Sequence, residues 1–265
     1  MRTLRRFLAS ALALVFSSSA LISAEENSHD KIRVLVVTGG HDFEKEPFFK
    51  LFSDNHDITW QAVEHPNAHA RLRPEAAKAY DVLVLYDMWQ PITDEAKQDF
   101  IDRLKEGKGL VVLHHAIASY QDWPVYQKVI GARYYLQKTT VDGVEKRRSA
   151  FKHDMNFKIH VADPAHPVTR GISDFDMHDE TYKWFDLAKE SHPLLTVEHP
   201  ESHEVIAWTR TYENARVVYL QSGHDHFAYE NPNYQRLLKQ AIRWTANKEL
   251  GGDRAIGPPG GPLKP

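Results

Sequence analysis

Residues 109–120, GLVVLHHAIASY, decide the fold of this chain and the place of its chemistry. The apolar run Leu110–Leu113 is rich in valine and follows a glycine, which predicts a strand buried on both faces. The run stops at His114 and His115, where an open α/β sheet binds its ligands, just outside the carboxyl end of a strand. The two imidazoles are therefore candidates for chemistry, although one could merely end the strand while the other packs.

Similar runs before and after this strand predict an alternation of strands and helices. Strands are expected at Lys31–Thr38, Asp57–Val63, Asp81–Tyr86, Phe157–Val161, Leu194–Glu198, Val205–Thr209 and Arg216–Leu220. Helices are expected at Glu46–Phe52, Pro74–Ala79, Asp94–Glu106, Trp123–Ile130 and Pro232–Trp244. The alternation predicts a doubly wound, mainly parallel α/β sheet with right-handed crossovers. One domain is expected over residues 31–247, with an antiparallel pair at 194–198 and 205–209.

The two ends of the chain differ from its middle. Three arginines precede an apolar run at residues 7–16, and small residues then lead to Ala24. This pattern is typical of a secretory signal peptide over residues 1–24, with cleavage at Ala20 or a retained anchor as alternatives. The glycine- and proline-rich end, residues 251–265, is expected to be a disordered tail. The prediction is an exported protein, periplasmic or extracellular, without stable membrane insertion after cleavage.

The composition excludes several classes of function. The net charge of −3 becomes more negative when the leader is removed, which argues against a nucleic-acid partner. The chain has no cysteine, so thiol nucleophiles, thiolate ligands and dithiol redox motifs are excluded. It has 16 histidines, the side chain that most often serves as a metal ligand and as a general acid or base. Homo-oligomerisation is left open.

Five motifs in this order resemble the ThuA-like family, named for trehalose utilisation. They are GGHD (39–42), GLVVLHHA (109–116), HPVTRGI (166–172), HDETYKW (178–184) and RVVYLQSGHD (216–225). The resemblance covers about residues 31–247 and implies a flavodoxin-like core related to class I glutamine amidotransferases. In that scaffold the nucleophile elbow falls at His114 or His115, and the catalytic histidine falls at His224. Because the thiol is missing, thiol-based glutamine hydrolysis is excluded, and no G-x-S-x-G elbow replaces it.

The strand ends predict where a metal would bind. His41, His115 and His224 follow three separate strands, whose exits share one edge of a doubly wound sheet. With Glu180, expected on a loop, they suit zinc or a similar divalent ion. Metal-free acid–base catalysis by His115 and Glu180 is the competing functional interpretation. The remaining alternative is a buried polar network without catalytic function.

Other residues complete the expected site. Catalytic roles are predicted for His115, Glu180, His224 and Asp179, and substrate contacts for Asp42, Asp87, Tyr120, His166, Tyr182 and Trp184. Aspartates adjacent to the ligands, namely Asp42, Asp179 and Asp225, are candidates for orienting them. His166 could instead shape its own loop, and His114 is expected to point into the sheet packing. Six further histidines in polar contexts are expected to be solvated: His65, His69, His153, His192, His199 and His203.

The resemblance implies a role in sugar catabolism. We therefore expect an exported carbohydrate-active enzyme, a metal-dependent hydrolase or lyase acting on glycosides, with 3-keto-glycosides suggested by the family. The alternative is a non-catalytic carbohydrate-binding protein on the same scaffold. In either case aromatic side chains at the site edge would suit the C–H faces of a sugar.

Overall fold

The computed structural model describes residues 31–248. The signal peptide expected at residues 1–24 and the tail expected at 251–265 lie outside the described residues. Between residues 31 and 248, no helix combines the length and the apolar character that crossing a membrane requires.

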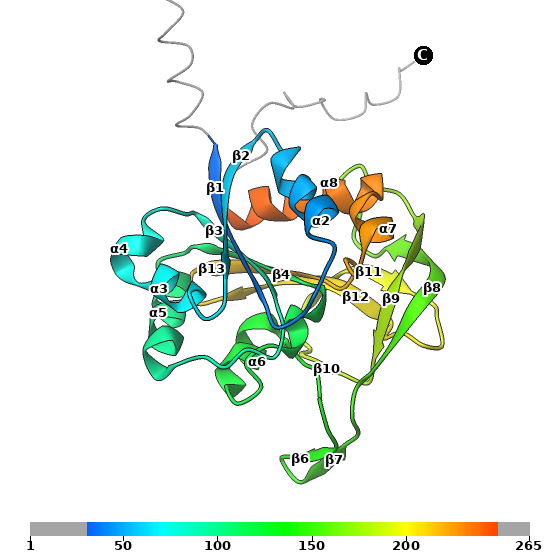
Figure 1. Ribbon diagram of the computed structural model, residues 1–265. Helices are drawn as coiled ribbons and strands as arrows, with labels where there is room; N and C mark the ends of the chain where they lie inside the picture. The colour runs from blue at the N-terminus through cyan, green and yellow to red at the C-terminus, as the bar shows by residue number, and fades with distance from the viewer. Residues whose placement is uncertain (1–30, 249–265) are drawn as a thin grey trace, which may run out of the picture. The chain divides into compact units, whose positions relative to one another are not determined.

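A mixed sheet of nine strands forms the centre of the fold (Figure 1), in the order β2-β1-β3-β4-β13-β12-β11-β8-β9. Its parallel half consists of β2 (Ile58–Glu64), β1 (Ile32–Gly39), β3 (Val82–Asp87), β4 (Gly109–Leu113) and β13 (Ala215–Leu220). This is the flavodoxin-like order of a doubly wound sheet, so the predicted fold class is confirmed.

The other half of the sheet is antiparallel. It consists of β12 (Val205–Tyr212), β11 (His192–Val197), β8 (Ala150–Val161) and β9 (Phe175–Lys183). The predicted antiparallel pairing of residues 194–198 with 205–209 is confirmed as β11 against β12. Short strands outside this sheet form two further pairs, β5 (Ala132–Arg133) with β10 (Asp186–Leu187) and β6 (Thr139–Val141) with β7 (Val144–Lys146).

Helices cover both faces of the parallel half, which explains why β1, β3, β4 and β13 are mostly apolar, whereas the edge strand β2 is largely exposed. One face carries α2 (Lys45–Ser53), α7 (His226–Tyr229) and α8 (Pro232–Thr245). The other carries α3 (Ala68–Leu72), α4 (Pro74–Ala77), α5 (Asp94–Lys105), the 3₁₀ helix η1 (His114–Ala118) and α6 (Pro124–Ile130). Alternate residues of one strand therefore enter different cores.

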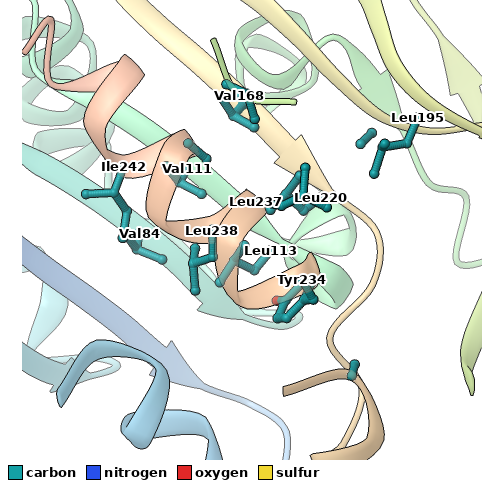
Figure 2. Packing of buried hydrophobic residues seen from close by; sticks show 14 of the residues in the cluster. Val84, Val111, Leu113, Val168, Leu195, Leu220, Tyr234, Leu237, Leu238 and Ile242 are labelled. Carbon is teal, nitrogen blue, oxygen red and sulfur yellow. The ribbon is translucent and has the colours of Figure 1, made fainter. Parts of the chain in front are cut away.

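The strand β4 illustrates this division. Val111 and Leu113 pack in the core beneath α8, and Leu110 and Val112 pack in the core on the opposite face. Figure 2 shows α8 lying over Val111 and Leu113, with Leu238 beside Leu113. Because both faces are buried, β4 holds the residues that follow it in a fixed position at the sheet edge.

The prediction of a loop around Glu180 is wrong, because residues 175–183 form the strand β9. Only the first half of this strand alternates, because Asp179, Glu180, Thr181 and Tyr182 are all buried in succession. Polar residues in a row, at the edge of a sheet and facing a polar site, lack the period of two by which a strand is recognised. The helix α3, which sequence patterns did not predict, is only one turn long.

Candidate functional site

The carboxyl ends of β1, β3, β4 and β13 meet at one edge of the sheet. His41, Trp89, His115 and His224 follow these strands, and β9 brings Glu180 to the same place. A cavity of about 120 Å³ opens there. Its wall is formed by His41, Met88, Trp89, His115, Ile117, Ala118, Tyr134, Phe151, His153, Glu180 and Tyr182. The structure thus brings together His41, His115, Glu180 and His224, the four side chains predicted to converge.

His114 occupies the elbow at the end of β4. Its φ of 49° lies in the left-handed region, directly after an extended Leu113 at −110°. This change of direction ends the alternation of the strand, so the expectation that His114 points into the sheet packing is wrong. The ring is buried, and its Nε2 lies 3.0 Å from Glu180 Oε2 and 2.9 Å from the Tyr182 hydroxyl.

The hydrogen bonds of His114 determine its protonation. Nδ1 lies 2.7 Å from the main-chain oxygen of Gln221, which can only accept, so Nδ1 carries the proton and Nε2 offers a lone pair to the site. A lone pair at 3.0 Å from a carboxylate requires a cation or a second proton between them. Burial opposes charge on His114, but the hydrogen bond and charge of Glu180 outweigh it and raise the pKa of His114. Burial likewise opposes charge on Glu180, and His114 lowers its pKa.

Three atoms of this cluster have the spacing of metal ligands. His114 Nε2 lies 3.0 Å from Glu180 Oε2 and 3.3 Å from His224 Nδ1, and the last two atoms lie 3.7 Å apart. A triangle of this size has a common point about 2 Å from each corner, the length of a zinc–nitrogen or zinc–oxygen bond. Two histidines and one glutamate are also the protein ligands of one class of catalytic zinc site. The residues fit a divalent metal, with His114 where His115 was expected.

His115 has a different role from His114. Its Nδ1 lies 3.3 Å from the main-chain oxygen of Asp87, so this nitrogen donates and Nε2 is an acceptor. Nε2 is buried and has no hydrogen-bond partner among residues 31–248. Burial, followed by the positive charges of His114 and His41, lowers the pKa of His115 well below its ordinary value. His115 is therefore a neutral base at the cavity wall, with the ring of His41 4.8 Å away.

Asp179 fixes the loop that carries His224. Its carboxylate accepts hydrogen bonds from the main-chain nitrogens of Gly223 at 2.8 Å and His224 at 3.1 Å. Burial raises the pKa of Asp179 to about 6. The predicted catalytic residue is thus a positioning residue, which holds a ligand histidine through the backbone. Asp225, also a candidate for orienting a ligand, instead accepts from the main-chain nitrogen of Phe227 and caps α7.

Replacing Asp179 with alanine should destabilise the fold by about 2–3 kcal/mol, because the main-chain N–H groups of Glu180, Gly223 and His224 lose their acceptor. Chemical denaturation of the purified variant measures this loss. Asp176→Ala is the matched control on the same strand, since the Asp176 carboxylate is exposed and pairs only loosely with Lys158, at 3.7 Å. Equal losses of stability in the two variants would contradict the role given to Asp179.

Asp87 and Tyr120, predicted to contact substrate, lie beneath the cavity wall. The Asp87 carboxylate lies 3.1 Å from Nε2 of His65, and the Tyr120 hydroxyl lies 3.0 Å from the same nitrogen. The expectation that His65 is solvated is wrong, because only 2% of its side chain is exposed. His153 is also not simply solvated: its Nδ1 lies 3.3 Å from Glu180 Oε1. His65 and His153 therefore both lie near the site, although the polar residues around them in the sequence predicted exposure to solvent.

The other predicted substrate residues are spread more widely. His166 accepts from the main-chain nitrogen of Val168 and packs on Trp244, so it shapes its own loop away from the cavity. Trp184 is exposed and lies against the Arg147 guanidinium, 4.3 Å from the ring centre. Asp42 is exposed beside His41. Tyr182 is the one of this group that reaches the site, through its contact with His114.

Comparison with known proteins identifies the family. The family model ThuA, described as trehalose utilisation, matches residues 33–245. A comparison with curated proteins finds no match.

Solved structures share the fold. A ThuA-like protein from Parabacteroides merdae superposes with a TM-score of 0.71 at 17% identity, covering 85% of this chain and 94% of that one. A ThuA-like protein from Bacteroides uniformis gives 0.62 at 20% identity, covering 83% and 94%. A glutamine amidotransferase from Thermotoga maritima gives 0.51 at 14% identity, covering 81% and 98%. With the family model matching most of its length, this chain belongs to the ThuA family, described as trehalose utilisation.

Proposed function

We propose that this protein is an exported, metal-dependent enzyme of sugar catabolism that cleaves glycosides carrying a keto group at C3, as a lyase or a hydrolase. The observation that carries the proposal is the His114–Glu180–His224 triangle beside the unpartnered Nε2 of His115. The family's description, trehalose utilisation, supports a carbohydrate substrate.

Three side chains would hold the ion: His114 through Nε2, His224 through Nδ1 and Glu180 through Oε2. Nitrogen and carboxylate ligands favour zinc among the common divalent ions. When bound, the ion would polarise the keto oxygen and make the neighbouring C–H group more acidic. Gln221 fixes the tautomer of His114, and Asp179 fixes the backbone of His224, so both ligand rings are held from outside the triangle.

His115 then acts as the base. Its Nε2 takes the proton from the carbon next to the keto group, and the electron pair of that C–H bond forms a carbon–carbon double bond as the glycosidic C–O bond breaks. His115 returns the same proton to the departing oxygen, so the elimination is balanced without an added acid. In the hydrolase version, water subsequently adds to the double bond.

Metal analysis of untagged protein, combined with turnover of a 3-keto-glucoside, tests the proposal. We expect about one divalent ion per chain, loss of turnover on chelation and recovery when zinc is added. A metal-free protein that turns over the substrate would replace the proposal by acid–base catalysis through His115 and Glu180. Binding of many glycosides without any product would favour a non-catalytic carbohydrate-binding protein.

A further inference from the structure

A second hollow adjoins the site cavity. Its volume is about 420 Å³, against about 120 Å³ for the cavity itself. The loop that follows β3 lines the cavity with Met88 and Trp89 and continues into the hollow with residues 90–92. Two other segments also line both spaces. Residues 117–118 and Tyr134 line the cavity, and residues 120–123 and Leu136, which follow them in the chain, line the hollow. The two spaces therefore lie close together, with Trp89 lining both.

Trp89 forms the wall that the two spaces share. It is 56% exposed, although large aromatic side chains are usually buried, and its φ of 53° lies in the left-handed region that bulky residues avoid. Residues held in such conformations cluster at ligand-binding positions. Tyr120, which also lines the hollow, has a φ of 50°.

The backbone around Trp89 is braced. The main-chain nitrogen of Met88 donates to the oxygen of Gly39, and the Gln90 amide donates to the oxygen of Met88, both at 2.9 Å. Gly40 packs so closely that an added Cβ would lie 1.9 Å from the Met88 oxygen. The indole is thus presented by a fixed loop, as a preorganised binding surface requires.

The chemistry of the hollow suits a sugar ring. Trp89 offers exposed aromatic surface, the largely buried Tyr120 and Trp123 line the hollow behind it, and Gln121 and Asp122 offer polar atoms. Ligand pockets combine mostly apolar and aromatic walls with a few polar groups that fix orientation. Flat apolar surface matches the C–H face of a pyranose, and the polar groups match its hydroxyls.

We infer that this hollow binds the second sugar ring of the substrate, so that the natural substrate class is a disaccharide or longer glycoside. The inference rests on the proposed function, since the reacting ring is taken to occupy the cavity beside His115. The cavity, at about 120 Å³, lies below the usual range for binding a whole drug-sized ligand, about 300–1,000 Å³, whereas the hollow lies within it. A disaccharide would place one sugar ring in the cavity and the other in the hollow.

Calorimetric titration of the zinc-loaded full chain with trehalose and with methyl α-glucoside tests the inference. We expect trehalose to bind at least about tenfold more tightly than methyl α-glucoside. A tenfold difference in affinity corresponds to the binding free energy of one well-formed aromatic contact with its buried area. Ile92→Trp, which fills only the second hollow, should reduce trehalose binding to the level of methyl α-glucoside and leave the latter unchanged. Trp89→Ala should lower the affinity for trehalose about tenfold, and Trp89→Phe should retain most of the wild-type affinity.

Phe227→Ala is the matched control, because Phe227 is exposed to a similar extent, 51%, and lines neither space. It should leave the binding of both sugars unchanged, and thermal melting should confirm that every variant is folded. Equal affinity for the two sugars, insensitive to Ile92→Trp, would overturn the inference and leave the proposed function standing. Failure of every sugar to bind would overturn both.

Discussion

Replacing His114 with alanine should abolish metal binding and reduce turnover of a keto-glycoside by about 10³-fold or more. The change removes one of three ligands and leaves the buried Glu180 carboxylate without its nearest imidazole partner, so the remaining two side chains cannot hold an ion tightly. Metal content by mass spectrometry and steady-state kinetics on the same preparation measure both losses. Circular dichroism of the variant distinguishes loss of the ion from loss of the fold.

His160→Ala provides the control for this experiment. The His160 ring is partly exposed and pairs with Asp174, outside the cavity wall, so both metal content and turnover should be retained. The opposite pattern, in which His114→Ala keeps the ion and His115→Ala loses it, would restore the ligand set predicted from the sequence, with His41 and His115, and would refute the one drawn from the geometry.

Replacing His115 with alanine should leave the metal content unchanged and reduce kcat by about 10²–10⁴-fold, the usual contribution of a general base. The reason is that His115 belongs to the cavity wall and its Nε2 has no hydrogen-bond partner among residues 31–248, whereas its Nδ1 lies 3.3 Å from the main-chain oxygen of Asp87. Because the main effect falls on the chemical step, KM should change little. A variant with normal kcat would exclude His115 as the base.

The parallel half of the fold was predictable because four of its five strands, β1, β3, β4 and β13, are buried on both faces. Such strands read as apolar runs, and their ends can be located to within a residue or two, as Val82–Asp87 and Gly109–Leu113 illustrate. Their order along the chain then places His41, His115 and His224 at one edge. The convergence of these histidines therefore follows from hydrophobic pattern and topology alone.

The ligand set was not predictable by the same reasoning. Choosing between His114 and His115 requires the backbone angle at the elbow, and a φ of 49° at a histidine leaves no signature in the sequence. The strand that carries Glu180 is hard to recognise from the sequence, because polar residues facing the site remove the alternation that marks a half-buried strand. Local pattern fails where side chains serve the site rather than the core.

The position of β9 has a consequence for what holds the curved sheet closed. Four strands separate β9 from β4 in the sheet, yet Glu180 lies 3.0 Å from His114, so the sheet must curl until its far edge meets its centre. An ion at that point would link β9 to the end of β4. The chain has no cysteine, so no disulfide can make such a link. Because such an ion binds only the closed form, it would act as a reversible cross-link whose strength is set by the metal supply around the protein.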